Sequence, residues 1–402
     1  MSEQTVSVHP VAGVRLGVAR AGIKYPNRRD LTLIELAPGS VTAAVFTRNA
    51  FCAAPVQVAR ANLAHHQPRY LLINTGNANA GTGQRGVEDA EASCMAVAQL
   101  MGCDWRQVLP FSTGVIGEPL PLKKIVDALP AAFADLRPEG WEDAAYGIMT
   151  TDTRPKLSSR RLTIGGETVT ITGIAKGAGM IKPDMATMLA FIATDAHLPH
   201  ALLAHALELA VADSFNAITI DGDTSTNDSC VLMATAQGGL VLLDAGEARY
   251  AEFVAALREV CTELAQAIVR DGEGATKFIT ITVEGGRDRE ECRQVAYTIA
   301  HSPLVKTAFF ASDPNWGRIL AAVGRAGLAE LDLEAIVIHL DEVCIVRDGG
   351  RDPAYSEEQG QRVMQRPDIT IRVHLGRGPA SATVWTTDLS FDYVKINAEY
   401  RT

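Results

Sequence analysis

Short strand-like segments and longer helical segments alternate along the whole 402-residue chain, and this pattern constrains the fold more than any other feature. Residues 31–36 and 40–46 are short, apolar or alternating, and bounded by Gly, Pro or Asn, as is typical of strands. Residues 86–101 place apolar side chains on one face of a helix, and 199–213 and 247–270 repeat that pattern. The sequence therefore predicts an α/β or α+β fold in which helices cover sheets.

Strand-like segments follow one another directly as often as they alternate with helices. In the second half of the chain we expect strands at 218–222, 230–236 and 278–284. A doubly wound parallel sheet needs regular alternation of strands and helices, so a layered sandwich is the better prediction. The Gly- and Pro-rich loops at 116–121 and 348–353 are candidate domain boundaries, although neither has the composition of a linker.

Charge and composition exclude several classes of protein. The chain has 37 Lys and Arg against 47 Asp and Glu, a net charge of −10, and no basic run, which argues against a nucleic-acid partner. No stretch approaches the roughly 18 apolar residues that cross a membrane, and the first ten residues lack the features of a signal peptide. The seven scattered cysteines form no CxxC pair, which indicates reduced thiols and a cytoplasmic setting.

The segment from 176 to 189, KGAGMIKPDMATML, contains the most informative run of residues. Two glycines and a proline turn the chain between expected strands at 169–175 and 188–194. Thr187 follows Ala186 directly at the start of the second strand. The simpler interpretation is a glycine loop before a buried strand, with the threonine present only because it favours strands.

The second interpretation is an N-terminal nucleophile. A threonine hydroxyl is a weak nucleophile, but at a chain N-terminus its own α-amine, with a pKa of about 8, serves as the base. This requires cleavage between Ala186 and Thr187. The same hydroxyl can make the cut by attacking the Ala186 carbonyl, which gives an ester that water resolves.

This segment resembles the KG(S/A)GMIxPxMATML signature of the ornithine acetyltransferases, the glutamate N-acetyltransferases of arginine biosynthesis. Further blocks resemble the family in the family's own order, from about residue 46 to the C-terminus. They are FTRN (46–49), CAAPV (52–56), NTGNANA (74–80), STGVIG (112–117), MTTDT (149–153), DGDTSTNDS (221–229), EGATK (273–277) and DPNWGR (313–318). Chance does not produce so many blocks in one order.

The resemblance implies that Thr187 both cleaves the chain and accepts the acetyl group. Cleavage after Ala186 would give an α chain of residues 1–186 and a β chain of residues 187–402, which stay associated, typically as an α2β2 assembly. The implied fold is a layered α-β-β-α sandwich with mixed sheets, built from two intertwined chains.

Thr113 and Gly114 match the positions that form the family's oxyanion hole, one through its hydroxyl and the other through its backbone N–H. Acyl transfer passes through a tetrahedral oxyanion, and losing one such donor raises the barrier by about 3 kcal/mol. By itself the Ser-Thr-Gly motif is better explained as an ordinary turn, and only the family resemblance reverses that preference.

The positions that match the family's substrate contacts carry side chains suited to an amino-acid substrate. Lysine holds a carboxylate, glutamate holds an ammonium group, and threonine and asparagine supply directional hydrogen bonds. We assign Lys176 to the carboxylate and Glu273 to the ornithine amine. The other implied contacts are Thr150, Asn397, Thr402 and Thr187 itself. Without the resemblance, Lys176 would be a solvated charge, Glu273 the end of a turn and Thr402 a frayed terminus.

The resemblance also implies the reaction. N2-acetylornithine gives its acetyl group to Thr187, ornithine leaves, and glutamate attacks the acetyl-threonine ester to form N-acetylglutamate, with ping-pong kinetics. No cofactor or metal is required, and some members of the family also accept acetyl-CoA as the donor. Many relatives have Asn where this chain has Asp184, so the rate of cleavage is less predictable than its occurrence.

Two other functions remain open from the residues. An amidohydrolase or aminopeptidase with the same kind of nucleophile would use water in place of glutamate, and a non-catalytic glycine-rich scaffold would never cleave itself. The acidic run 221–229 has the composition of a calcium or magnesium loop but not the spacing of an EF-hand, so we expect a hydrogen-bonded loop near the site.

Overall fold

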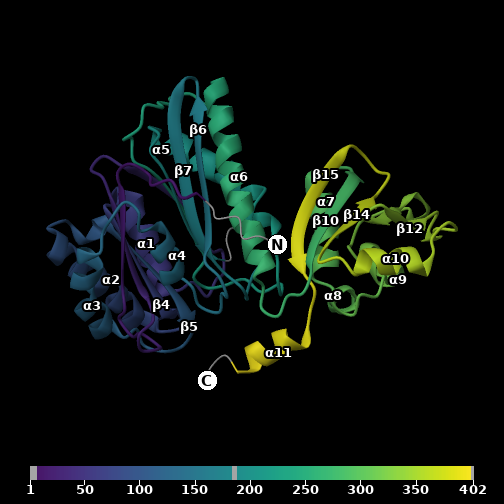
Figure 1. The fold of residues 1–402 in the computed structure, drawn as a ribbon, viewed down its shortest axis with the longest axis horizontal. Helices are drawn as coiled ribbons and strands as arrows, with labels where there is room; N and C mark the ends of the chain where they lie inside the picture. The colour runs from purple at the N-terminus through teal and green to yellow at the C-terminus, as the bar shows by residue number, and fades with distance from the viewer. Residues whose placement is uncertain (1–6, 183–187, 400–402) are drawn as a thin grey trace. The chain divides into compact units, whose positions relative to one another are not determined.

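The computed structural model describes residues 7–182 and 188–399, and these form two compact units (Figure 1). Unit 1 consists of Met1–Asn216 and Asp223–Ile268, and unit 2 consists of Ala217–Gly222 and Val269–Thr402. The chain passes between the units at 216/217, at 222/223 and at 268/269, and the last of these crossings falls in the last turn of a long helix. The loops at 116–121 and 348–353 lie inside unit 1 and unit 2 respectively, so the sequence-based prediction of boundaries there is wrong.

Unit 1 contains two mixed sheets. The first has the order β1-β2-β4-β5, in which only β4 and β5 are parallel; the second has the order β3-β9-β8-β7-β6, in which only β8 and β9 are parallel. The strands of the first sheet are β1 (Val14–Ala19), β2 (Leu31–Leu36), β4 (Tyr70–Asn77) and β5 (Val108–Val115). Those of the second are β3 (Val41–Phe46), β9 (Ser229–Ala234), β8 (Leu189–Thr194), β7 (Glu167–Lys176) and β6 (Lys156–Ile164).

An apolar layer joins the inner faces of these two sheets. Leu71 and Phe111 from the first sheet and Phe191 and Val231 from the second belong to one buried cluster. The rings of Phe111 and Phe191 meet edge to face with their centroids 5.0 Å apart. Helix α4 (Trp141–Gly147) adds the fully buried Trp141 to the same layer. Each such side chain contributes roughly 1.5–3 kcal/mol through burial, so this layer fixes how the two sheets stack.

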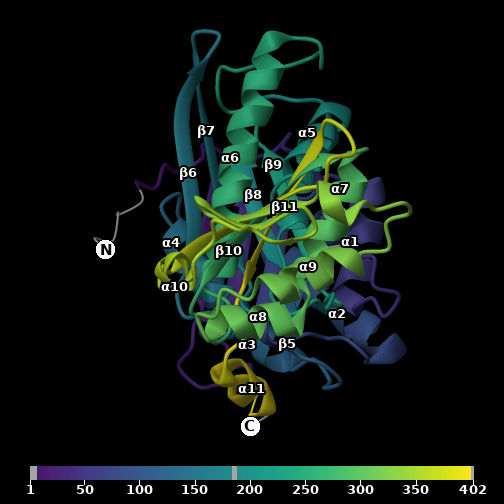
Figure 2. The same ribbon diagram turned by 90° about the vertical axis from the view of Figure 1, so that its right-hand side faces the viewer.

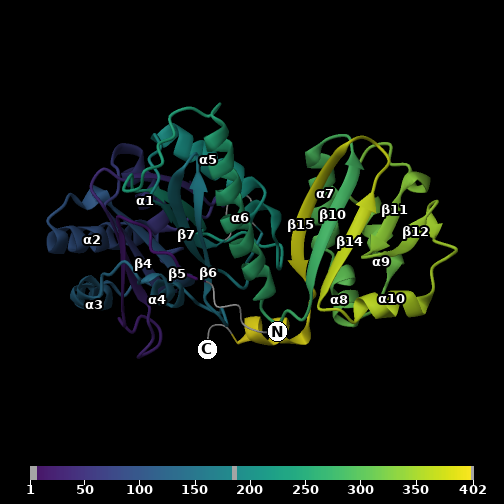
Figure 3. The same ribbon diagram turned by 45° about the horizontal axis from the view of Figure 1, so that its top comes forward.

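Helices cover the outer faces of both sheets (Figures 1 and 3). Helices α2 (Gly83–Met101) and α3 (Leu122–Ala134) pack on the first sheet, and α5 (His200–Ala212) and α6 (Ala248–Arg270) pack on the second. Helix α1 (Ala54–His65) runs along β5. The layering predicted for the fold, α-β-β-α with mixed sheets, is therefore confirmed in unit 1, and its three helices predicted from periodicity are confirmed to within three residues at either end.

Unit 2 is a six-stranded sheet with helices on one face (Figure 2). Its strand order is β13-β12-β11-β14-β10-β15. In β10 the side chains of Ile279, Ile281 and Val283 are buried against the helices, while the alternating Thr280 and Thr282 lie on the more exposed face. The strands are β10 (Phe278–Gly286), β11 (Val337–Leu340), β12 (Val343–Arg347), β13 (Gly350–Arg351), β14 (Asp368–His374) and β15 (Ala380–Thr387), and the helices are α7 (Arg289–Ala300), α8 (Pro303–Phe310), α9 (Trp316–Gly324), α10 (Glu357–Met364) and α11 (Phe391–Ala398). Short 3-10 helices are η1 (Trp105–Gln107) in unit 1, η2 (Phe215–Ala217), where the chain passes from unit 1 to unit 2, and η3 (Leu333–Ala335) in unit 2.

The strand predicted at 218–222 is absent from the structure. Ile218 forms only an isolated bridge with Trp385, to which the N–H of Thr219 also donates. The apolar pattern arises because Ile218 and Ile220 are both buried, and Gly222 then turns the chain with a φ of +85°. The buried isoleucines give this segment the apolar pattern of a strand, although its backbone does not continue to pair with a neighbouring strand.

Within residues 7–182 and 188–399, no helix combines the length and the apolar character needed to span a membrane.

Unit 2 contains a buried lysine beside the end of β15. The Nζ of Lys306 donates to the Oγ1 of Thr386 at 3.0 Å and to the backbone carbonyl of Thr387. Burial lowers the pKa of Lys306 to about 8, although the charges of Asp388 and Asp221 act in the opposite direction.

We predict that Lys306 makes the stability of the protein depend on pH and that the variant Lys306→Met lacks this dependence. An unfolded lysine titrates near 10.4, so between pH 8 and about 10.4 the unfolded chain binds more protons than the folded one. The free energy of unfolding of the wild type should therefore rise with pH across that interval, by up to about 3 kcal/mol relative to the variant. Urea unfolding of both proteins at pH 7.5 and 10 measures this; a difference that stays constant with pH would contradict it.

Candidate active site

Thr113 and Gly114 lie near the end of β5, where it pairs with β4 across a register irregularity. Thr113 is opposite Thr75, and Gly114 is opposite Gly76. Gly114 has a φ of +136°, and a Cβ at this position would stand 2.3 Å from the carbonyl carbon of Gly76. Only glycine allows the two backbones to approach so closely, which gives the Ser-Thr-Gly motif a structural requirement of its own.

Hydrogen bonds from two directions fix the strand that carries Thr113. The hydroxyl of Ser112 donates to Oδ1 of Asn74 at 2.6 Å, and the carbonyl of Ser112 accepts from Nδ2 of Asn227 at 2.9 Å. Asn227 also donates to the carbonyl of Ala78 at 2.6 Å. Donors for a reaction intermediate are effective only when they are held in place beforehand, and this strand meets that condition.

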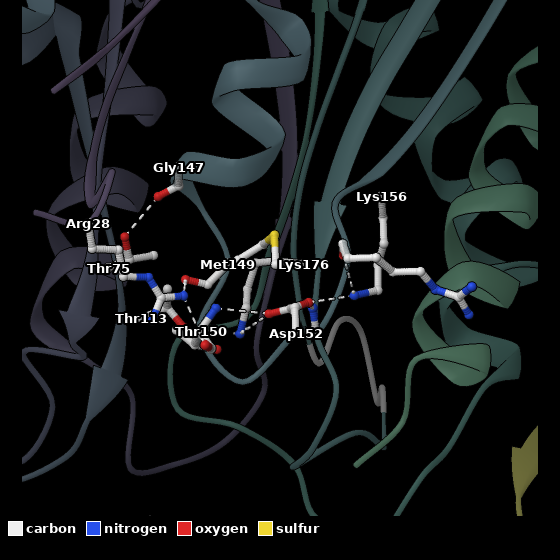
Figure 4. A network of polar contacts seen from close by, with 11 residues as sticks. Arg28, Thr75, Thr113, Gly147, Met149, Thr150, Asp152, Lys156 and Lys176 are labelled. Carbon is white, nitrogen blue, oxygen red and sulfur yellow. Dashed lines mark hydrogen bonds and ion pairs between the residues drawn. The ribbon is translucent and has the colours of Figure 1, made fainter. Parts of the chain in front are cut away.

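The turn that follows α4 carries Thr150 and is held from the side of β4. Arg28 donates through Nη2 to the carbonyls of Met149 and Thr150, at 2.7 and 2.9 Å, and the hydroxyl of Thr75 donates to the carbonyl of Gly147 at 2.8 Å (Figure 4). The backbone around Thr150 is therefore fixed against the first sheet.

Asp152 is the centre of the polar network in this part of unit 1 (Figure 4). Its Oδ1 accepts from Nζ of Lys156 at 2.6 Å and from the N–H of Gly177 at 2.7 Å. Its Oδ2 accepts from the N–H of Thr150 at 2.9 Å and lies 4.0 Å from Nζ of Lys176. The carboxylate is buried, and the side chain of Lys156 is also almost completely buried.

The charges around Asp152 favour its ionised form. Burial alone raises the pKa of this carboxyl group, but the ammonium groups of Lys176 and Lys156 and the donors that bond to it hold the pKa well below its usual range. Lys176 ends β7, and its Nζ lies 3.4 Å from Oγ1 of Thr113. The network thus connects three of the predicted site residues, Thr113, Thr150 and Lys176.

A second buried carboxyl group, Asp228, lies just before β9. Among the described residues its Oδ2 has no hydrogen-bond partner, and burial raises its pKa well above the usual range despite the opposing effects of Ser225 and Lys176. The N–H of the next residue, Ser229, donates to the carbonyl of Met188 at 2.9 Å. Burial therefore favours the uncharged form of this acid, which lies next to the start of β8.

The loop that contains Asp228 is tied to the rest of unit 1 by its backbone. The carbonyl of Ser225 accepts from the hydroxyl of Thr47 at 2.8 Å, and the carbonyl of Thr224 accepts from the Asn49 side chain at 2.9 Å. The acidic run therefore forms a hydrogen-bonded loop beside β5, as the sequence predicts. In the described part of the chain no group of three or more His, Cys, Asp or Glu side chains is arranged to hold a metal ion.

Glu273 and Asn397 lie together in unit 2. The Nδ2 of Asn397 donates to Oε2 of Glu273 at 2.8 Å, and Asn397 projects from α11. The turn after Glu273 contacts the start of that helix closely: a Cβ on Gly274 would stand 2.5 Å from the backbone nitrogen of Tyr393, and the hydroxyl of Ser390 donates to the Gly274 carbonyl. A positive φ of +68° at Gly274 permits this approach.

The predicted site residues thus form two groups. Thr113, Gly114, Thr150 and Lys176 belong to unit 1, and Glu273 and Asn397 belong to unit 2. Asp184, Ala186, Thr187 and Thr402 lie outside the described residues.

Sequence reasoning missed the residues that organise the first group. Asp152 falls within the MTTDT block, but nothing in its spacing singles it out, and Lys156 reads as an ordinary charged residue at the start of a strand. Asp228 was visible only as part of an acidic run. The signal that identifies them is the strand register, which a single sequence does not contain.

Comparison with known proteins gives one consistent family. The sequence matches the ArgJ family over residues 15–402. It is 63% identical over 393 residues to a protein of Methylococcus capsulatus and 58% identical over 397 residues to one of Pseudomonas fluorescens, each named arginine biosynthesis bifunctional protein ArgJ. These alignments cover 98% of this chain and 96% and 98% of the two relatives.

Two solved structures of similar sequence cover about half of this chain. An arginine biosynthesis bifunctional protein ArgJ of Bacillus halodurans is 40% identical, with a TM-score of 0.48 over 51% of this chain and 95% of that one. An ornithine acetyltransferase of Mycobacterium tuberculosis, solved in complex with ornithine, is 34% identical, with a TM-score of 0.40 over 44% and 94% of the two chains.

Because the backbone of Gly76 lies so close to Gly114, we predict that two alanine variants differ in stability. Gly114→Ala and Gly117→Ala both place alanine at a positive φ, at a cost of about 1–3 kcal/mol each, but nothing lies within 4 Å of a Cβ at Gly117. The contact with Gly76 should make Gly114→Ala less stable by a further 1–3 kcal/mol or so. Urea unfolding measures the free energy of unfolding of both variants. Equal losses of stability would show that β4 moves away from the new methyl group at no cost in free energy.

Proposed function

The chain belongs to the ArgJ family, and we propose from this membership and the site described above how its residues carry out the family's reaction. The protein is a glutamate N-acetyltransferase of arginine biosynthesis. It transfers the acetyl group of N2-acetyl-L-ornithine to L-glutamate and so forms L-ornithine and N-acetyl-L-glutamate. Because both close relatives are named bifunctional, we propose that it also acetylates glutamate from acetyl-CoA.

The proposed nucleophile is Thr187, freed by cleavage of the bond that joins it to Ala186. The adjoining strand supports this assignment. Strand β8 begins at Leu189, pairs with β7 on one side and β9 on the other, and is preceded by Met188, whose carbonyl accepts from Ser229. A new N-terminus two residues before β8 would adjoin a strand that is paired on both sides.

The proposed chemistry consists of two mirror-image half-reactions. The α-amine of Thr187 takes the proton of its own hydroxyl as Oγ1 attacks the acetyl carbonyl of N2-acetylornithine. The tetrahedral intermediate collapses, the C–N bond breaks, and the α-amine of ornithine leaves with that proton. The α-amine of glutamate then attacks the acetyl ester, and the Thr187 oxygen recovers a proton as it leaves.

Thr113 and Gly114 are proposed to hold the oxyanion of both half-reactions. Their supporting observation is the fixed β4–β5 pair, together with the 3.4 Å distance between Oγ1 of Thr113 and the ammonium of Lys176. A nearby positive charge favours an oxygen that gains negative charge in the transition state. The single observation that carries the proposal is this juxtaposition of Thr113 with Lys176.

For the substrate we propose two recognition groups. Lys176 binds the α-carboxylate with the help of Thr150, and Glu273 and Asn397 bind the side-chain amine of ornithine, with a further contact from Thr402. A carboxylate already held by an amide donor is a suitable partner for an ammonium group. The reaction needs no cofactor, because the acetyl group arrives on its donor and leaves on its acceptor.

We further propose a cytoplasmic setting and an α2β2 assembly of residues 1–186 with 187–402. All seven cysteines are free thiols, which suits a reducing compartment. The alternative is an amidohydrolase with the same nucleophile, in which water resolves the acetyl ester. Product formation that depends on glutamate separates the two: a hydrolase would release acetate at the same rate without it.

We predict that the intact mass of the denatured wild type reveals two chains, of 186 and 216 residues. Thr187→Ala should give one chain of 402 residues and no release of ornithine from N2-acetylornithine, because both the cleaving hydroxyl and the acetyl acceptor are missing. Turnover of acetylornithine by this variant would disprove the assignment of the nucleophile. A single mass for the wild type would direct attention to Asp184.

We also predict that Thr113→Ala lowers kcat by about 100- to 1,000-fold, the usual effect of losing one oxyanion donor. Thr113→Ser is the matched control, because it keeps a hydroxyl on the same strand position and should retain most of the rate. Both variants must first yield two chains, which the intact mass establishes. Equal rates for the two variants would exclude the hydroxyl from the oxyanion hole.

A further inference from the structure

One buried amide side chain links the two sheets of unit 1 beside the proposed oxyanion hole. Asn227 lies just before β9 of the second sheet and is only 6% exposed. Its Nδ2 carries two protons and has two acceptors, the carbonyl of Ser112 in β5 at 2.9 Å and the carbonyl of Ala78 just after β4 at 2.6 Å. Both donors of this side chain are therefore directed at the first sheet, next to Thr113 and Gly114.

The position of Asn227 is fixed by further hydrogen bonds. The hydroxyl of Thr226 donates to Oδ1 of Asn227 at 2.6 Å, which leaves the amide nitrogen to face the two carbonyls. The backbone on either side is also held: the carbonyl of Thr226 accepts from the N–H of Ala53 at 3.0 Å, and the carbonyl of Asp228 accepts from the N–H of Thr47 at 2.9 Å. Since buried polar groups are costly to leave unpaired, these contacts favour one orientation of the amide.

The pairing of β8 with β9 relates Asn227 to the proposed nucleophile. The two strands are parallel, Leu189 is paired with Ser229, and the N–H of Ser229 donates to the carbonyl of Met188 at 2.9 Å. Counted along the chain, Asn227 and Thr187 each stand two residues before this pair. The amide that bonds to the oxyanion-hole strand therefore comes from the strand next to the one that follows the proposed nucleophile.

We propose that Asn227 is a positioning residue for the oxyanion hole. It acts through the carbonyl of Ser112, which directly precedes Thr113, and so sets the distance between the donors on β5 and the second sheet. This inference rests on the proposed function, in which Thr113 and Gly114 hold the oxyanion formed at Thr187. Because a misplacement of about 1 Å can lower a rate by about 100-fold, a residue that acts only through Ser112 can still control the reaction.

The first test is Asn227→Ala, which removes both donors. In a ping-pong reaction, kcat/KM for N2-acetylornithine reports the first half-reaction and kcat/KM for glutamate reports the second. Both values should fall by a similar factor, about 10- to 100-fold, because the two half-reactions use the same oxyanion hole. A loss confined to one substrate would indicate a role in binding that substrate and would overturn the proposal, as would no loss at all.

A double-mutant cycle with Thr113→Ala distinguishes positioning from a general structural role. A residue that acts through the hydroxyl of Thr113 loses part of its effect once that hydroxyl is absent. Asn227→Ala should therefore lower the rate by a smaller factor in the Thr113→Ala background than in the wild type. Equal factors in the two backgrounds would show that Asn227 acts independently of the oxyanion hole and would overturn the proposal.

The matched control is Asn62→Ala. Asn62 is a buried residue of α1, and its Nδ2 donates to the carbonyl of Val108 at 2.9 Å, at the opposite end of β5 from Thr113. Its loss should lower the midpoint of urea unfolding but leave both kcat/KM values close to those of the wild type. A loss of activity as large as that of Asn227→Ala would indicate a general weakening of β5 and would overturn the proposal.

Two further measurements keep this inference separate from the function on which it rests. If Asn227→Ala does not fold or does not yield two chains, Asn227→Gln replaces it with the same expected outcomes, because it keeps the amide but moves it by one methylene group. The pair Thr113→Ala and Thr113→Ser tests the proposed function, since equal rates for these two variants reject the oxyanion hole itself. If they differ as expected but the Asn227 variants act additively with Thr113→Ala, only the inference about Asn227 fails.

Discussion

A carboxylate removed from water has to be neutralised and hydrogen-bonded, and Asp152 imposes this requirement on the structure around it. It is satisfied by one direct lysine contact, one longer-range lysine and two backbone N–H groups. These partners come from the turn after α4, the start of β6 and the end of β7. A single buried charge therefore joins three segments of the chain.

The apolar layer between the two sheets of unit 1 explains why polar groups collect where they do. Along the strands, side chains such as Leu71, Phe111 and Phe191 fill the layer. At the strand ends apolar packing gives way to polar contacts: Lys176 on the second sheet faces Thr113 on the first, and Asn227 bonds to the carbonyl of Ser112. Sheets held at a fixed spacing by the layer also hold these polar groups at a fixed spacing, which is the preorganisation that acyl transfer requires.

Sequence alone predicts the helices and strands of this protein better than it predicts which of them lie next to one another. Helical periodicity locates α2, α5 and α6 because a buried helix face repeats along the chain itself. The prediction of a strand at 218–222 was wrong because the apolar pattern of Ile218 and Ile220 is the same whether or not the backbone continues to pair. Thr113, Gly114 and Lys176 come from the family resemblance. Asp152 and Lys156 did not emerge, because their importance depends on the β6–β7 register and on burial, neither of which has a pattern in sequence.

The two substrates of the proposed reaction share one end and differ at the other, and the site residues divide in the same way. Acetylornithine and glutamate both present an α-carboxylate and an α-nitrogen, so a Lys176 that binds the α-carboxylate, as proposed, would serve both half-reactions without change. Their side chains end in opposite charges, an ammonium and a carboxylate. A Glu273 that binds the ammonium, as proposed, would favour the first and repel the second. Asn397 does not relieve this repulsion, because its Nδ2 already donates to Glu273 and to the carbonyl of Tyr393, and only its amide oxygen, an acceptor, remains for a ligand.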